Sequence, residues 1–100
     1  MLLSMQKLFK LRRGRPTGAT TFDPRLARAF GAAVRERRQS LGISQEDLSS
    51  LANVERSHMG KLERGEHLPS LQIILRLGDA LGVNPGALID RTVALMEPSS

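Results

Sequence analysis

Apolar residues recur at three- and four-residue spacing through most of the chain after residue 23. The first such stretch runs from Pro24 to Leu41 and carries one apolar stripe interrupted by an arginine. The residues of this stripe are Leu26, Phe30, Ala33, Val34, Arg37 and Leu41. The spacing is that of an α-helix with one buried face. Asp23 suits the N-cap, Pro24 the first helical position and Gly42 the left-handed residue that ends a helix. The pattern predicts a helix over residues 24–41.

Two shorter helices are predicted next. Ser44 can cap the first of them, and Asp47 can complete a shortened capping box. The residues expected to face inward are Leu48, Leu51 and Ala52. Asn53 tolerates positive φ and ends this helix. The following helix is predicted from near Glu55 to Gly65. Its expected buried side consists of Val54, Met59 and Leu62.

Two more helices complete the pattern. Pro69 and Ser70 open the fourth helix, with Ser70 as its cap. The residues expected to share its face are Leu71, Ile74, Leu77, Gly78 and Leu81. Gly82 ends it, and Asn84-Pro85 caps a fifth helix, which contains Leu88 and Ile89 and which we expect to continue through Val93 to Met96. The composition favours helices packed on helices, since its only aromatic residues are three Phe.

Positive charge is concentrated toward the N-terminus. The formal net charge is +5. Residues 1–20 have no acid and five basic residues, which are Lys7, Lys10, Arg12, Arg13 and Arg15. Residues 21–100 are formally neutral, but the first predicted helix is rich in arginine. We therefore expect a flexible basic arm over 1–21, a helical domain over 22–96 and a short tail over 97–100. This polarity is typical of a protein that meets a polyanion with one face; the alternative is a solvated tail on an ordinary domain.

The sequence lacks the residues that several classes of function require. The sequence has no Cys, so disulfides and thiolate metal sites are excluded. His67 has no second metal ligand at useful spacing, and no phosphate-binding glycine loop or nucleophile with a paired base is present, so we expect no metal, no cofactor and no enzyme activity. No apolar run approaches the roughly 20 residues that cross a bilayer. The apolar stretch at the start of the sequence is too short and too interrupted for a secretory signal. We expect a cytoplasmic protein without a membrane partner.

The second and third predicted helices, with their tight turn, make a helix-turn-helix. Five residues must point into the angle between the helices: Leu48, Ala52, Val54, Met59 and Leu62. Ala52 is small enough where the helices approach, and Asn53 suits the turn.

Three motifs extend the resemblance to a known family beyond the helix-turn-helix itself. They are G-I-S-Q-E-D-L (42–48), K-L-E-R-G-E (61–66) and P-S-L (69–71). Over roughly residues 25–90 the chain resembles the lambda-repressor/Cro-like (XRE-type) helix-turn-helix family. The resemblance implies an all-α, five-helix, lambda-repressor-like DNA-binding domain.

The resemblance also implies roles for individual residues. The third helix would be the recognition helix, with Arg56, Ser57 and Lys61 reading bases in the major groove. Contacts to the DNA backbone, or positions beside it, fall to Gln45, His58, Gly60 and Arg64. Arg38 and Glu63 match a structural ion pair that ties the first helix to the end of the third.

Other interpretations of these residues remain open. Arg56 and Lys61 can simply keep a helix soluble, and His58 can be an exposed polar residue. Gly60 either lets the helix approach DNA closely or is a poor helix residue that packing tolerates. Glu55 stands where the family commonly has a capping Ser or Thr, and it brings a negative charge near DNA.

The arm contains Arg12-Arg13-Gly14-Arg15-Pro16, which resembles the core of an AT-hook. Arg12, Arg13 and Arg15 would then lie along a narrow A·T minor groove. The alternative is a disordered tail that contacts phosphates only.

The function that these observations predict is a transcription regulator, a repressor or autoregulator of bacterial or phage type that acts at the nucleoid. It would bind double-stranded DNA as a homodimer on a pseudo-palindromic operator. The expected interface, with core completion as the alternative, consists of Leu88, Ile89, Val93, Leu95 and Met96. The rival function is an antitoxin that binds both operator DNA and a toxin partner.

Overall fold

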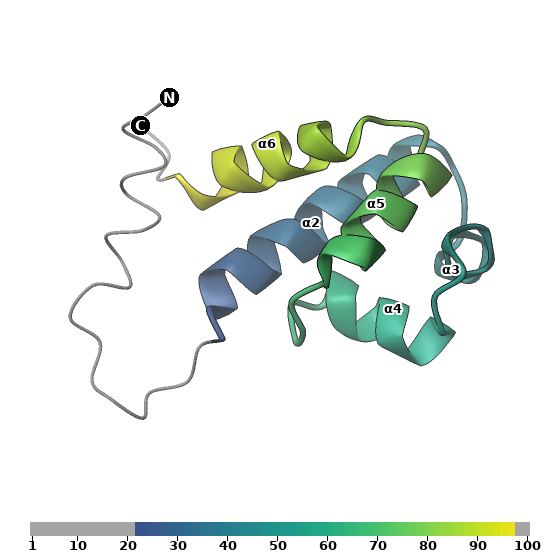
Figure 1. Ribbon diagram of the computed structural model, residues 1–100, viewed down its shortest axis with the longest axis horizontal. Coiled ribbons are helices and arrows are strands. Elements are labelled where there is room, and N and C mark those ends of the chain that lie inside the picture. The colour runs from purple at the N-terminus through teal and green to yellow at the C-terminus, as the bar shows by residue number, and fades with distance from the viewer. Residues whose placement is uncertain (1–21, 98–100) are drawn as a thin grey trace.

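The computed structural model describes residues 22–97, which form five α-helices and no strand (Figure 1). Their bounds are α2 Pro24–Ser40, α3 Gln45–Ala52, α4 Arg56–Glu63, α5 Leu71–Ala80 and α6 Pro85–Met96. The all-α, five-helix prediction is confirmed. The arm residues Arg12, Arg13 and Arg15 lie outside the described residues. Within the described range, no helix is both long enough and apolar enough to cross a bilayer.

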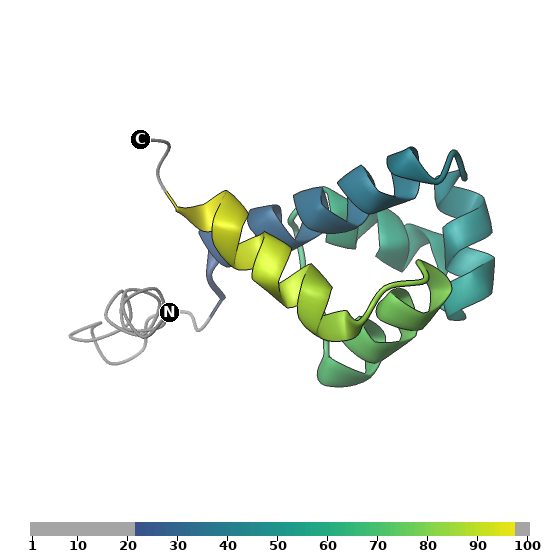
Figure 2. The ribbon, with the colours of Figure 1, turned by 90° about the horizontal axis from the view of Figure 1, so that it is seen from above.

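The long helices α2 and α6 lie side by side and run in opposite directions (Figures 1 and 2). The start of α2 is joined to the end of α6, because the Arg25 side chain donates to the Met96 carbonyl at 2.6 Å. The short helix α3 lies at the opposite end of the molecule, and α4 returns from it toward the middle of α2 (Figure 1). Helix α5 packs against both α3 and α6.

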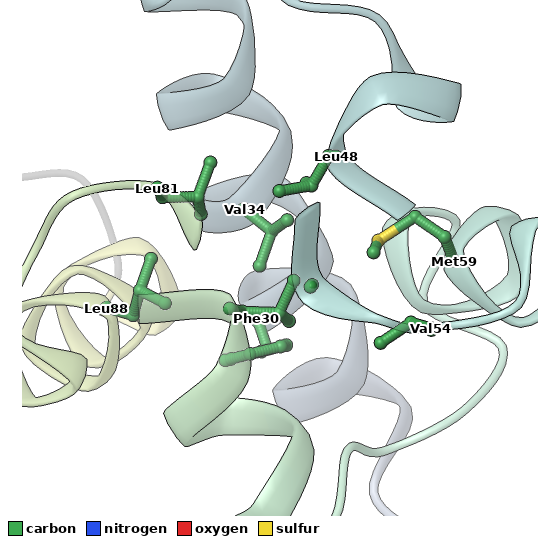
Figure 3. Close-up of a cluster of buried hydrophobic side chains, with 9 residues drawn as sticks. Phe30, Val34, Leu48, Val54, Met59, Leu81 and Leu88 are labelled. Atoms are coloured by element: carbon green, nitrogen blue, oxygen red, sulfur yellow. The ribbon is translucent and has the colours of Figure 1, made fainter. Parts of the chain in front are cut away.

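A single apolar cluster joins all five helices (Figure 3). Its buried members are Phe30, Val34, Leu48, Ala52, Val54, Met59, Leu77, Leu81 and Leu88. Burial of this surface is the main force that holds helices of only 8 to 17 residues together. The inward positions predicted for α4, namely Val54, Met59 and Leu62, are all confirmed as buried.

The local signals at the helix ends are confirmed. The side chains that accept capping hydrogen bonds are those of Asp23, Ser44, Ser70 and Asn84. At α3 both bonds of the capping box form, with Asp47 as the acidic partner. Asn53 is left-handed at φ 56°, and it is the only residue other than Gly with positive φ between residues 22 and 97.

Three leucines that were expected to be buried are exposed instead. Leu41, Leu51 and Leu71 retain 43%, 63% and 69% of their surface. Leu41 follows the last residue of α2 and Leu71 is the first residue of α5, so both lie beyond the packed part of their helix. Leu51 is exposed because α3 turns the face that carries Ser49, and not Leu51, toward the core. Ser49 is buried, and its hydroxyl donates to the Gln45 carbonyl at 2.8 Å.

The predicted interface on α6 is wrong for two of its five residues. Leu88 and Met96 are 3% and 7% exposed and complete the core of one chain. With Thr92 they occupy every fourth position of α6, which is the face that packs against α2. The Thr92 hydroxyl is buried there and donates to the Leu88 carbonyl at 2.7 Å. Ile89 and Leu95 remain exposed.

Candidate nucleic-acid interface

The turn between α3 and α4 is held from three directions. Two backbone bonds close it, from Asn53 N–H to the Ser50 carbonyl and from Val54 N–H to the Ser49 carbonyl. Val54 inserts its side chain into the core and is 8% exposed. From α5, the Arg76 guanidinium donates to the Asn53 carbonyl at 3.4 Å. The angle between α3 and α4 is therefore set by both local and long-range contacts.

Helix α4 is fixed from beneath. Met59 and Leu62 have no exposed surface. On α2, a Cβ at Gly31 would collide with the backbone carbonyls of Leu62 and Glu63, so the two helices touch without intervening side chains. A Cβ at Gly65, which follows α4 at φ +76°, would likewise collide with the backbone of Arg28. Only glycine fits these two contacts, and they fix the position of α4 on α2.

The opposite face of α4 points outward. The residues that share this face by helical periodicity are Arg56, Ser57, Gly60, Lys61 and Arg64. The four with side chains are all exposed. His58 lies on a different side of the helix, half-buried beside His67, with ring centroids 5.5 Å apart and a tilt of 60°. The structure thus groups the three expected base-reading residues and separates His58 from them.

A network of polar side chains connects α2, α3 and α4. Arg38 donates two hydrogen bonds to Glu63, at 2.7 and 2.9 Å, and a third to the Ile43 carbonyl at 3.1 Å. The side chains of Arg38 and Glu63 are 13% and 3% exposed. The bonds from Arg38 to Glu63 raise the pKa of that guanidinium above its ordinary value. This is the ion pair that the family resemblance implied.

Gln45 is part of the same network. Its side-chain amide donates to Glu63 Oε1 at 3.1 Å, a contact that the sequence did not indicate. An amide nitrogen carries two hydrogens. One is used by Glu63, which leaves the second for another acceptor.

The Arg64 side chain folds back along the outward face of α4. A Cβ at Gly60 would lie 3.0 Å from Arg64 Nη1 and 3.5 Å from Gln45 Oε1. Gly60 is therefore covered by Arg64 and Gln45 rather than open to an approaching ligand. In the free protein, its missing side chain makes room for the guanidinium of Arg64.

One acidic residue near this face was missed by the sequence reasoning. Glu66 accepts from Arg64 Nε at 2.7 Å and from Nη2 at 3.4 Å. The hydrogen bond from Arg64 holds the pKa of the Glu66 carboxyl below its ordinary value, and the nearby charges of Lys61 and His67 act in the same direction. The signal that could have found it is the run Arg64-Gly65-Glu66, because a helix that ends in a left-handed Gly turns the next residue back toward the helix.

The described residues contain no group of three or more His, Cys, Asp or Glu placed to hold a metal ion. The two histidines of the sequence, His58 and His67, lie side by side, which the sequence had not indicated. Two imidazoles alone do not complete the four-ligand set of a structural zinc site.

Comparisons with known proteins agree with this geometry. The family described as a helix-turn-helix domain matches residues 29–92. An uncharacterised helix-turn-helix-type transcriptional regulator of Methanothermobacter thermautotrophicus is 41% identical over 49 residues, which cover 49% of this chain and 71% of that protein. Control protein C.BamHI of Bacillus amyloliquefaciens is 39% identical over 64 residues, or 63% of this chain and 79% of that protein.

A solved structure shows the same fold at higher identity. The restriction-modification controller protein C.AhdI of Aeromonas hydrophila is 43% identical, with a TM-score of 0.60 over 63% of this chain and 94% of that one. These relatives are described as a transcriptional regulator and as control or controller proteins, and they lend no support to the antitoxin alternative. The residues matched by the family, 29–92, begin within α2 and end within α6. They therefore include the whole of the α3–turn–α4 unit. The chain belongs to the helix-turn-helix domain family.

Proposed function

We propose that this chain is a sequence-specific double-stranded DNA-binding transcription regulator that places α4 in the major groove. The observation that carries the proposal is the two-sided character of α4. One side is fully buried against α2 and the core, and the other presents exposed Arg56, Ser57 and Lys61. An α-helix fits the major groove of B-DNA, where each base pair has a distinct pattern of donors and acceptors.

Arg56 and Ser57 stand in the first turn of α4, and Lys61 lies one turn further along. In helix-turn-helix proteins the N-terminal residues of the recognition helix lie nearest the bases. Arg56 can donate two hydrogen bonds to the O6 and N7 atoms of guanine, which discriminate that base by about 1–3 kcal/mol. Glu55, just before the helix, makes no capping bond with its side chain.

Phosphate contacts would orient the domain on the duplex. Gln45 begins α3, where backbone N–H groups and the helix dipole favour an anion. Arg64 lies beside it across Gly60. His58, on another side of α4, and the arm residues Arg12, Arg13 and Arg15 are further candidates, the latter in an A·T minor groove.

We infer that two copies bind a pseudo-palindromic operator, because one recognition helix covers only a few base pairs. The surface that suits a second copy spans α5 and α6. Leu75 and Ile89 are 52% and 44% exposed. Leu75 precedes Gly78 by one turn, Ile89 follows Pro85 by one turn, and Gly78 and Pro85 pack against each other. Each side chain thus lies about one turn from that helix–helix contact, and we propose that both belong to the surface that a second copy covers.

The relatives named above also favour a regulator, since one is described as a transcriptional regulator and two as control or controller proteins. The sign of regulation that we propose is repression or autoregulation at an operator. Such a protein would act at the nucleoid of a prokaryotic cell.

Selection of bound sites from random duplex DNA tests the proposal. We expect an enriched motif of two inverted half-sites, with centres about 10 base pairs or a multiple apart. The same selection with Arg56→Ala/Lys61→Ala is expected to lose the preference at the positions those residues read. Arg91→Ala, an exposed arginine on α6, serves as the control and should leave the motif unchanged.

A second variant sharpens the assignment of Arg56. Arg56→Lys keeps the positive charge but loses the planar fork that binds guanine at two points. We expect it to bind mixed-sequence DNA as the wild type does and to relax the preference at one base pair of each half-site. Unchanged preference in a folded Arg56→Ala/Lys61→Ala variant would contradict the proposal.

A further inference from the structure

The carboxylate of Glu66 occupies a position on the face that would meet DNA. The Arg64 guanidinium lies over Gly60 on the outward face of α4, and Glu66 is bonded to that guanidinium through both oxygens. Both side chains are about half exposed, at 59% and 50%. An anion is thus already bound where a DNA phosphate would approach Arg64.

The backbone holds Glu66 in this place. The Glu66 N–H donates to the Lys61 carbonyl at 2.9 Å and the Gly65 N–H donates to the Leu62 carbonyl at 3.1 Å. This is the pattern in which a left-handed glycine ends a helix and turns the next residue back over its last turn. Because Gly65 also touches the backbone of Arg28, the loop cannot move away without separating α2 from α4. The position of the Glu66 backbone is therefore fixed by the fold.

We infer that Glu66 is a built-in competitor for DNA phosphate, which binds Arg64 in the free protein and must release it when the chain binds DNA. This inference rests on the proposed function. Carboxylate and phosphate each have two oxygens that can accept hydrogen bonds from the arginine fork, so the exchange replaces one charge-assisted pair by another. Exposed ion pairs of this kind are weak. The exchange therefore lowers DNA affinity without preventing binding.

Salt dependence is the sharpest consequence. An arginine that already holds a carboxylate brings no net charge to the duplex, whereas a free arginine displaces a counterion. Glu66→Gln keeps the size of the side chain and removes its charge. We expect this variant to bind about three- to eightfold more tightly at roughly 0.1 M salt, with a log–log salt slope steeper by up to about 0.9.

The chain offers a matched control. Glu36 on α2 accepts two bonds from Arg91 on α6, at 2.8 and 2.9 Å, and that pair is also about half exposed. Glu36→Gln changes the net charge by the same amount on a part of the surface away from α4. It should change affinity by less than about twofold, because distant exposed charges are screened by salt.

The experiment measures salt titrations of binding to the duplex selected by the wild-type chain and to a mixed-sequence duplex of the same length. Arg64→Ala is expected to weaken binding to both, and Glu66→Gln should have no further effect in the Arg64→Ala background. An equal gain from Glu66→Gln and Glu36→Gln would overturn the inference. So would an undiminished gain in the Arg64→Ala background, which would place the effect in the general field of the protein.

The two proposals fail separately. A wild-type chain that binds both duplexes equally contradicts sequence-specific regulation, while the comparison of Glu66→Gln with Glu36→Gln still decides the inference, since the exchange needs only a backbone phosphate. A chain that binds neither duplex contradicts both.

Discussion

At the scale of single residues, two glycines inside helices differ in what a side chain at their position would meet. Gly31 lies where α2 touches the backbone of α4, so a Cβ there would meet the carbonyl oxygens of Leu62 and Glu63. Gly60 lies beneath the end of a flexible arginine, and the nearest atom to its Cβ position is Arg64 Nη1 at 3.0 Å. Backbone cannot yield to a new methyl group, but an arginine tip can.

Alanine at these two positions should therefore shift stability in opposite directions. Gly60→Ala is expected to stabilise the fold by up to about 1 kcal/mol, the difference in helix propensity between the two residues. Gly31→Ala should destabilise it by about 1–3 kcal/mol, because the helices must move apart. Urea-induced unfolding followed by circular dichroism measures both. Two shifts of the same sign would show that the contacts described for one of these glycines are wrong.

The buried ion pair of Arg38 and Glu63 gives a second prediction for stability. Arg38→Met leaves a carboxylate that is almost fully buried without its charged partner, and we expect a loss of about 3–5 kcal/mol in the free energy of unfolding. Arg38→Met/Glu63→Leu removes the stranded charge and should recover much of that loss.

The exposed pair of Glu36 and Arg91 is the control for this measurement. Arg91→Ala breaks an ion pair with similar hydrogen-bond lengths whose two side chains are about half exposed to water, so it should change stability little. If Arg38→Met were no more harmful than Arg91→Ala, the network that joins α2, α3 and α4 would not be stabilising.

The sequence predicted these residues unevenly. The pairing of Arg38 with Glu63, 25 positions apart, was implied by the resemblance to a family, and no local pattern indicates it. The bond from Gln45 to Glu63 and the cover of Gly60 by Arg64 depend on side-chain positions that follow only from the packed arrangement of α3 and α4. Local sequence carries no information on such contacts.

At the scale of helices, the ends were predicted more accurately than the buried faces. A cap such as Ser44 or Asn53 acts on backbone atoms within a few residues, so its effect can be seen in the sequence. Which leucine is buried depends on neighbouring helices. Leu51 has the spacing of a core residue, but α3 turns Ser49 inward in its place. The same limitation led to Leu88 and Met96 being assigned to an interface between chains.

The exposed residues of α5 and α6 make a prediction about association. Leu75→Glu places a charge on the apolar surface beside Gly78 and Pro85, and should convert the proposed dimer to a folded monomer, as measured by sedimentation equilibrium. Leu51→Glu, at a position of similar exposure on α3, is the control and should leave association unchanged. A Leu75→Glu variant that associates as strongly as the wild type would place the interface elsewhere.

At the scale of the whole molecule, charge and shape divide the proposed work between the arm and the helical domain. The five basic residues without an acid all precede residue 20, whereas residues 21–100 are formally neutral. Non-specific attraction to a duplex would thus come mainly from the arm, and discrimination between sequences from α4.

Deletion of residues 1–18 separates the two interpretations of the arm. If Arg12, Arg13 and Arg15 enter a minor groove, the truncated chain should lose its preference for A·T pairs flanking the site, as shown by repeating the selection. A uniform loss of affinity with a shallower salt slope, and with no change in flank preference, would indicate a tail that contacts phosphates only.

The glycine contacts between α2 and α4 bear on how such a protein can change its target. Helix α4 is held in place by the main-chain contacts at Gly31 and Gly65 and by the buried side chains of Met59 and Leu62. None of these groups would touch a base. The outward positions 56, 57 and 61 take no part in that attachment. Substitutions at these three positions can therefore change which operator the protein binds while the fold stays the same.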